Sequence, residues 1–426
     1  MAFDTDKNLR NQVMYSVFVR NYSVEGTFEG VRKDLGRIKD LGVDIIWLMP
    51  IHPLGEKARK GVLGSPYAIK NYREVNPEFG TMDDLKRLVD DIHSLGMKCI
   101  IDVVYNHTSP DSWLSQNHPE WFYHKEDGSF GNRVGDWTDI IDLDYSNLDL
   151  WDYQIDTLKM WAEIVDGFRC DVASLVPLEF WLRARSEVAK VRENCIWLSE
   201  SIEHSFIRYI RSQGMTALSD SEIYQAFDIA YDYDTAGDFV DCLLGKITLS
   251  DYAKVLNLQE SIYPDNYVKL RFLENHDRPR AHQLIASENA LRVWTAFMYF
   301  QKGMPLIYNG QEVGAKHLPS LFDKDTISWQ EQVNLTPLMQ KLSAIRRDEL
   351  FADSAYSVSA PCEGVLTAMH RRGDSRILGV FPVKSTGALV SIDMPDGTYT
   401  DLLSGDSVEV KFGMLSVTQN AVIIKV

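Results

Sequence analysis

The strongest constraint on this chain is a set of four apolar runs that each end in charged or imidazole side chains. Long apolar runs without alternation are typical of strands buried on both faces of a parallel sheet. The carboxyl ends of such strands meet at one edge, and in a closed barrel they share one site. The four runs are Asp102–His107, Gly167–Asp171, Ile196–Glu200 and Phe272–Asp277. The sequence therefore predicts one polar site assembled from distant parts of the chain.

Helical and strand patterns alternate through the first 105 residues. Thr27 is expected to cap a helix that ends near Leu41, and Thr81 a second helix that ends at Gly96. An apolar run follows each helix after a short joint, which argues for βα units and a parallel sheet. The two runs are Val43–Met49 and Lys98–Val104.

Further strands are expected along the chain, and their number is compatible with eight. They are predicted near Val13–Val19 and at Val165–Asp171, Cys195–Glu200, Gln225–Ile229, Val268–Asn275 and Pro305–Tyr308. The alternation breaks from His107 to about Asp136, a polar and aromatic stretch that is long enough to be functional. The last 75 or so residues consist of short alternating runs separated by turns, which predicts an antiparallel β module.

Composition narrows the class of protein. The net charge of −17 disfavours a nucleic-acid partner, because phosphate binding needs clustered Lys and Arg. No stretch approaches the roughly 20 apolar residues of a membrane span, and the first residues show no secretory signal pattern. The five scattered cysteines favour free thiols in a reducing compartment, so we expect a cytoplasmic protein. The sequence carries no signal for oligomeric state.

Three of the polar groups at the strand ends are carboxylates that suit the hydrolysis of a glycosidic bond. In such a reaction one carboxylate acts as nucleophile and another as acid and base, so the two need opposite protonation states. Asp171 lies two residues from Arg169 on the same strand face, and we expect that guanidinium to lower the pKa of Asp171 and make it the nucleophile. Glu200 follows an apolar run that should raise its pKa, which suits the acid and base. Asp277 is expected to hold sugar hydroxyls.

Taken singly, each of these signals also has a structural interpretation. An aspartate beside an arginine at a strand end is often a plain ion pair, and a lone histidine is usually just hydrogen-bonded. The joint order of the four segments along the chain favours a shared site.

In that order the segments resemble the α-amylase family of glycoside hydrolases. Two further stretches, Gly42–Pro50 and Gly303–Glu312, fit the same family, and the match covers essentially the whole chain. The resemblance implies an α/β fold: a TIM (β/α)8 barrel at residues 1–106 and 137–351, a short inserted domain after the third strand at 107–136, and a C-terminal antiparallel β domain at 352–426. It also implies retention of configuration through a glycosyl-enzyme intermediate.

The resemblance carries roles over to individual residues. It implies that Asp171 is the nucleophile, Glu200 the acid and base and Asp277 the third carboxylate. It implies that five residues bind substrate, with Tyr67 as a stacking platform: Tyr67, Asp102, His107, Arg169 and His276. Asn106, with Asp136, could also hold a calcium ion, which prefers hard oxygen ligands; alternatively Asn106 merely fixes the insert by hydrogen bonds. No organic cofactor is expected.

Two departures from the family pattern bear on substrate choice. Many relatives carry Lys-His just after the nucleophile segment, whereas this chain continues Asp171–Pro177 without them. Related oligo-α-glucosidases usually place Asp after the platform tyrosine, whereas this chain has Ala68, which favours an open cleft over a closed exo pocket.

We therefore expect an α-amylase-like hydrolase of α-1,4-glucosidic bonds in maltodextrins or starch-type α-glucans. One alternative is an α-glucosidase or α-glucan transglycosylase that uses the same residues, since water or a second sugar can release the intermediate. The other is a non-catalytic carbohydrate-binding protein, which is expected to lack one or more of the carboxylates.

Overall fold

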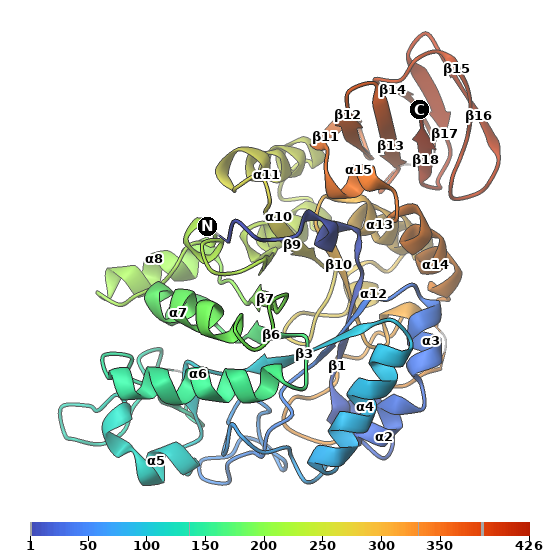
Figure 1. Cartoon of the computed structure of the whole chain (residues 1–426). Coiled ribbons are helices and arrows are strands. Elements are labelled where there is room, and N and C mark those ends of the chain that lie inside the picture. Colours follow the sequence, from blue (N-terminus) through green and yellow to red (C-terminus); the bar gives the residue numbers. More distant parts are fainter. Residues whose placement is uncertain (1, 136, 331, 385–386) are drawn as a thin grey trace.

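The computed structural model describes residues 2–135, 137–330, 332–384 and 387–426. Eight parallel strands close into a barrel in the order β1-β10-β9-β8-β7-β6-β3-β2, with helices around it (Figure 1). The barrel strands are β1 (Met14–Val17), β2 (Ile45–Leu48), β3 (Lys98–Val103), β6 (Gly167–Cys170), β7 (Ile196–Ser199), β8 (Ile229–Tyr231), β9 (Val268–Arg271) and β10 (Met304–Tyr308). The expected TIM barrel is confirmed.

Side chains alternate between the inside of the barrel and the surrounding helices. Ile45 and Trp47 of β2 pack in the inner cluster, whereas Ile46 and Leu48 belong to the outer core against the helices. This period of two residues is the geometry of a strand. Ile100 of β3 is also an inner residue, so the inside of the barrel is a packed core and not a pore.

Outside the inserted segment, the described residues form fourteen helices, short ones included. They are α1 (Val19–Tyr22), α2 (Phe28–Arg32), α3 (Leu35–Asp40), α4 (Met82–Ser94), α6 (Leu148–Ala162), α7 (Leu178–Val188), α8 (His204–Ser212), α9 (Asp220–Ile223), α10 (Tyr233–Leu243), α11 (Leu249–Ile262), α12 (Ala281–Leu284), α13 (Glu288–Phe300), α14 (Thr336–Ile345) and α15 (Glu349–Ala352). Short 3-10 turns occur at η1 (Lys7–Asn11), η3 (Ala173–Leu175) and η4 (Gln311–Val313).

The first predicted helix is interrupted. Thr27 caps α2 as expected, but the helix does not run unbroken to Leu41, because α2 and α3 are separated at Asp34. At the break, the Asp34 carboxylate accepts hydrogen bonds from Tyr22 Oη and Arg37 Nε. The second predicted helix is confirmed, with a capping box at its start.

One strand begins later than predicted. The sequence favoured a strand at Gln225–Ile229, whereas β8 begins at Ile229. The preceding apolar residues fill the turn before the strand, where the Phe227 ring lies 5.1 Å from Trp181 and 6.1 Å from Trp197. Their apolar character reflects packing against α7 and β7, not strand pairing.

The segment between β3 and α6 leaves the barrel and returns to it. It contains β4 (His107–Thr108), α5 (Trp113–Asn117), η2 (Pro119–Trp121) and β5 (Ile141–Asp142). β4 and β5 pair antiparallel, so the chain rejoins the barrel after β5, beyond residue 136. Trp121 and Phe122 are buried here and give the segment a small core of its own.

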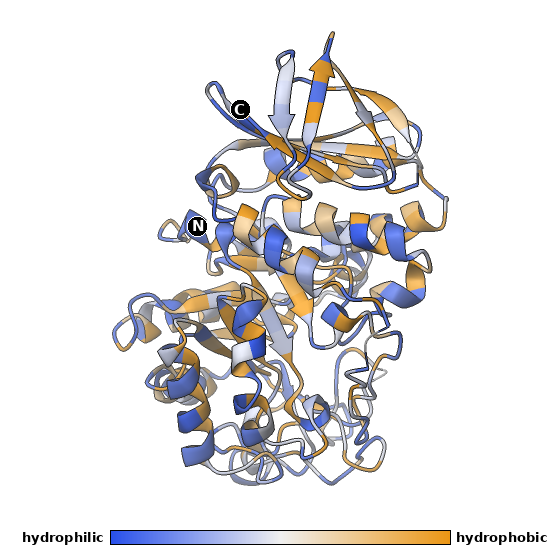
Figure 2. Cartoon of the chain, turned by 90° about the vertical axis from the view of Figure 1, so that its right-hand side faces the viewer, coloured by the Kyte–Doolittle hydropathy of each residue, from blue (hydrophilic) through white to orange (hydrophobic). Residues whose placement is uncertain are grey.

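The C-terminal part forms two four-stranded antiparallel sheets with the orders β11-β12-β13-β18 and β14-β17-β16-β15. The strands are β11 (Ala355–Cys362), β12 (Val365–Arg372), β13 (Ser375–Phe381), β14 (Ala388–Ser391), β15 (Gly397–Thr400), β16 (Ser407–Lys411), β17 (Met414–Val417) and β18 (Val422–Lys425). Phe381 of β13 packs against Phe297 and Phe300 of α13, which joins this module to the barrel. Figure 2 shows the alternation of hydrophobic and hydrophilic residues along its strands.

Among the helices that the structure describes, none combines the length and the apolar content needed to cross a membrane. All five cysteines are free thiols, and four of them are buried.

Candidate active site

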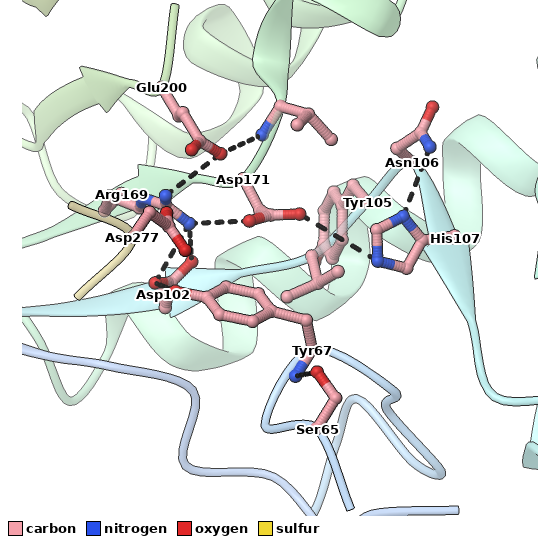
Figure 3. Close-up of polar contacts among 12 residues, drawn as sticks. Ser65, Tyr67, Asp102, Tyr105, Asn106, His107, Arg169, Asp171, Glu200 and Asp277 are labelled. Atoms are coloured by element: carbon pink, nitrogen blue, oxygen red, sulfur yellow. Dashed lines mark hydrogen bonds and ion pairs between the residues drawn. The ribbon is translucent and has the colours of Figure 1, made fainter. Parts of the chain in front are cut away.

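The polar residues predicted at the strand ends converge at the mouth of the barrel (Figure 3). Asp102 lies in β3 and Arg169 in β6, while Asp171 and Glu200 directly follow β6 and β7. Asp277 lies in the loop beyond β9. The structure thus brings together the three carboxylates that the sequence proposed as catalytic.

The register of the sheet explains this convergence. Asp102 pairs with Arg169 across β3 and β6, and Arg169 pairs with Leu198 of β7. Leu198 belongs to the inner cluster of the barrel, so this row of side chains faces inward. Asp171 and Glu200 lie two residues beyond Arg169 and Leu198, and therefore point to the same side one layer higher.

Arg169 is the centre of the site. Its Nη1 lies 2.9 Å and 3.1 Å from the two carboxylate oxygens of Asp102 and 2.7 Å from Asp171 Oδ1. Its Nη2 lies 3.0 Å from Glu200 Oε2. The guanidinium is fully buried, with the Trp47 ring 5.2 Å away. Because one cation faces three carboxyl groups, ionising all three at once is costly.

Glu200 has a second partner next to the proposed nucleophile. The backbone N–H of Val172 donates a 2.8 Å hydrogen bond to Glu200 Oε2. Val172 has φ of 36°, in the left-handed region that a β-branched residue rarely adopts. Arg169 and this peptide group together hold Glu200 beside Asp171.

A tyrosine and a histidine form the other wall. Tyr67 Oη lies 2.6 Å from His276 Nε2, and the two rings stack at 5.6 Å and 20°. The same nitrogen lies 3.1 Å from Asp277 Oδ2, and Tyr67 Oη donates a long 3.5 Å bond to Asp102. Tyr67 is therefore fixed in place before any ligand arrives.

His107 approaches the nucleophile from the inserted segment. Its Nε2 lies 4.0 Å from Asp171 Oδ2, and its Nδ1 lies 3.2 Å from Asn106 Nδ2. An amide nitrogen donates, so Nδ1 accepts and the ring proton is on Nε2, facing Asp171. Burial lowers the pKa of His107 to about 4, which keeps the ring neutral.

Burial and charge set different protonation tendencies for the carboxyl groups. Burial raises the pKa of Glu200 to about 7 against the opposing pull of Arg169. Burial likewise raises the pKa of Asp102 to about 6. For Asp277, burial acts in the same direction, but His276 and Arg169 outweigh it and the pKa is lowered. Glu200 is thus suited to hold a proton near neutral pH, and Asp277 to stay ionised.

The prediction that Arg169 would lower the pKa of Asp171 is wrong in its net result. Arg169 does favour the ionised form, but burial is the larger cause, and Asp102 adds to it, so the pKa of Asp171 rises to about 6. The sequence showed that Arg169 lies near Asp171, but it did not show how deeply Asp171 is buried. At neutral pH, a pKa near 6 still leaves Asp171 mostly ionised.

Of the two residues suggested as calcium ligands, the structure describes only Asn106. Asn106 is buried and contacts His107, which agrees with a role in fixing the insert by hydrogen bonds. Asp136 lies outside the described residues. Within the described residues, no group of three or more His, Cys, Asp or Glu side chains is placed to hold a metal ion. The cation that faces the neighbouring carboxylates, Asp142 and Asp144, is Arg133.

Sequence reasoning missed two features of the site. The left-handed backbone of Val172 has no sequence signal, because valine does not favour that conformation. Glu203 and Arg278, from the loops beyond β7 and β9, form an ion pair, and the Arg278 guanidinium lies 4.9 Å from the Tyr233 ring. Their separation in sequence hides this contact.

Comparisons with known protein families agree with this geometry. Residues 4–353 match the family model described as "Alpha amylase, catalytic domain", and residues 357–424 match "Bacterial Alpha amylase C-terminal domain".

Solved structures resemble the whole chain. An α-amylase from Lactobacillus plantarum superimposes with a TM-score of 0.97 at 50% identity, over 99% of this chain and 100% of that one. A maltogenic α-amylase, AmyB, from Thermotoga neapolitana gives 0.88 at 36% identity, over 98% and 99%. The α-amylase MalA of Haloarcula japonica is 25% identical over 95% of this chain, which spans 60% of that relative's length.

Proposed function

This chain belongs to the α-amylase family of glycoside hydrolases, and from that premise we propose that it hydrolyses α-1,4-glucosidic bonds in maltodextrins with retention of configuration. Members of this family act on O-glycosyl bonds. The finer proposal concerns the linkage, the substrate and the residue roles.

The observation that carries the proposal is the way Glu200 is held beside Asp171. One guanidinium, that of Arg169, contacts both carboxyl groups, and the peptide N–H directly after Asp171 binds Glu200. Retaining enzymes place their two carboxyl groups roughly 5–5.5 Å apart, whereas inverting enzymes leave a wider gap for water. Shared partners of this kind favour the short separation.

The carboxylate oxygens that Arg169 and Val172 leave free indicate which atom of each residue takes part in the reaction. Arg169 binds Asp171 Oδ1, so Oδ2 is the oxygen available to attack the anomeric carbon. Arg169 and Val172 both contact Glu200 Oε2, so Oε1 is the oxygen that carries the proton. In the first step the Asp171–carbon bond forms, the glycosidic bond breaks, and the leaving oxygen takes the proton of Glu200.

The second step reverses these roles. Glu200, now ionised, removes a proton from water, the water oxygen attacks the anomeric carbon, and the bond to Asp171 breaks. Asp277, whose pKa is lowered, supplies negative charge beside the cationic transition state. His107 remains neutral and can donate from Nε2 to a sugar hydroxyl.

For substrate choice, we infer internal cleavage of soluble chains. Ala68, which follows the stacked Tyr67, is small and buried, and offers no carboxylate to clamp a chain end. Five free thiols favour a reducing compartment, so we place the reaction in the cytoplasm.

The test uses maltoheptaose labelled at its reducing end. The wild-type chain should give a spread of shorter labelled products at early times. Asp171→Asn and Glu200→Gln should each lower kcat by roughly 10²–10⁴-fold. Asp152→Asn, which changes an exposed carboxylate of α6, should leave the rate unchanged. Full activity in either site variant would refute the assigned roles, and release of unlabelled glucose alone would refute internal cleavage.

A further inference from the structure

Where the inserted segment meets the barrel, an arginine side chain lies between two carboxylates. Arg133 Nη1 is 3.9 Å from Asp142 Oδ2, and Arg133 Nη2 is 3.8 Å from Asp144 Oδ1. The Asp142 side chain is almost completely buried, with 2% of its surface exposed. A buried carboxylate requires a compensating cation or hydrogen bonds.

Further contacts fix the guanidinium there. Arg133 Nη1 donates to the backbone carbonyl of Leu143 at 3.2 Å, and the Arg133 backbone N–H donates to Asp142 Oδ2 at 2.7 Å. On its other side the guanidinium lies over the Tyr123 ring, 4.7 Å from the centroid. These contacts make Arg133 part of the junction and distinguish it from a loose surface side chain.

The same junction holds the oxygen groups that a hard cation would use. A cavity of about 360 Å³ is lined by Asn106, Asp142, Asp144 and Arg133 among others. The contacts of Arg133 with Asp142 go to Oδ2, and Oδ1 is buried and makes no hydrogen bond with the described residues. A calcium ion bound to these carboxylates would be close to the guanidinium, and like charges at such distances repel strongly. Calcium also prefers six to eight oxygen ligands. The described residues therefore fit a guanidinium better than a calcium ion.

We propose that Arg133 is the resident cation of this junction, and that the chain folds and holds its insert without bound calcium.

The junction is coupled to the active site through the short sheet of the insert. Asp142 of β5 pairs in register with His107 of β4, whose Nε2 faces Asp171. Loss of the Arg133 charge should thus loosen β5 and, through it, the position of His107. Arg133 is a positioning residue in this scheme, since it touches neither substrate nor the reacting carboxylates.

The wild-type chain gives the first test. After purification, its calcium content is measured by elemental analysis, and its Tm is measured with EGTA and with 5 mM calcium chloride, about the level that saturates weak protein sites. We expect far less than one calcium per chain and the same Tm in both buffers. One calcium per chain, or a Tm that EGTA lowers and calcium restores, would overturn the proposal.

Substitutions give the second test. Arg133→Met removes the charge at similar length and should lower Tm by about 2–4 °C, with no recovery in calcium and with a higher KM for maltoheptaose. Arg133→Lys should recover most of the loss. A wild-type Tm for Arg133→Met would contradict the proposal, and if that variant does not fold, the calcium measurements on the wild-type chain still decide.

Arg73→Met is the matched control. The Arg73 guanidinium also stacks on a tyrosine, 4.0 Å from the Tyr153 ring, but its hydrogen bonds go to the Thr157 hydroxyl and the Tyr153 carbonyl. This variant loses stacking without exposing a buried carboxylate. A KM increase equal to that of Arg133→Met would mean that stacking, not charge, explains the effect.

Discussion

The peptide N–H of Val172 points at Glu200 Oε2, 2.8 Å away, and Val172 adopts a φ of 36° in doing so. Such a conformation costs of the order of 1–3 kcal/mol and persists where the surrounding structure imposes it. The residue follows Asp171 directly, so the strain is located between the two carboxyl groups proposed for the reaction. We infer that strain at Val172 contributes to their relative placement.

Val172→Gly should therefore separate stability from activity. Glycine adopts this φ without steric cost, so the free energy of unfolding should stay the same or rise by up to about 1 kcal/mol. The looser backbone should weaken the bond to Glu200, lower kcat by roughly 2- to 10-fold, and move the alkaline limb of the kcat–pH profile upward, because that bond lowers the pKa of Glu200. Val172→Ala, which keeps a Cβ, is the control; an unchanged profile in the glycine variant would contradict the inference.

Glu200→Gln should stabilise the chain in a pH-dependent way. Burial raises the pKa of Glu200 from 4.5 to about 7, so the folded state favours the protonated form and loses stability as pH rises through this range. Glutamine removes that penalty, by up to about 3 kcal/mol above pH 7 and by almost nothing below pH 4.5. Calorimetry from pH 4.5 to 8 measures the difference, with a Glu179→Gln substitution at an exposed position of α7 as control. A gain independent of pH would show that titration of Glu200 is not its cause.

Arg169→Lys should be far from conservative. An ammonium cannot contact Asp102, Asp171 and Glu200 as the forked guanidinium does. We expect kcat to fall by about 100-fold or more, with a smaller change in KM. Steady-state kinetics on maltoheptaose would show it, and Arg183→Lys at the surface of α7 serves as control. Near-normal kcat in the Arg169 variant would mean that charge alone suffices.

Tyr67 provides a test of the platform assignment. Tyr67→Ala removes the stacked ring and should raise KM by roughly tenfold, equivalent to about 1.4 kcal/mol. Tyr67→Phe keeps the ring but loses the 2.6 Å contact with His276, so it should change KM little and kcat modestly. An equal rise of KM in both variants would show that the hydroxyl, not the ring face, binds the sugar.

The sequence was sufficient to predict which site residues come together wherever strand geometry alone determines their positions. Asp171 and Glu200 come together because each follows a parallel strand by a fixed step and the strands are in register. Such relations depend on periodicity, which a single sequence displays. The parallel sheet and the C-terminal antiparallel module also follow from periodicity, whereas closure of the sheet into a barrel was implied by the resemblance to the family.

Features that depend on packing were beyond sequence reasoning. The turn before β8 was predicted as a strand because it is apolar. In the structure this apolar character serves packing, since Phe227 contacts two tryptophans that are distant in the sequence. The pKa of Asp171 was misjudged because burial, which the sequence does not show, exceeds the effect of Arg169. The contacts of Arg133 with Asp142 and Asp144 were not predicted, because an irregular loop, which has no periodic sequence pattern, brings these residues together.

The charge around Arg169 has a consequence for which sugars can enter. At neutral pH the mostly ionised Asp102, Asp171 and Asp277 outnumber the Arg169 guanidinium, while Glu200 can hold a proton. We therefore expect the barrel mouth to favour uncharged sugars: a neutral saccharide enters without Coulomb cost, while a phosphorylated one brings a dianion toward ionised carboxylates. We therefore expect sugar phosphates to inhibit the hydrolysis of maltoheptaose only weakly, and inhibition kinetics would measure this.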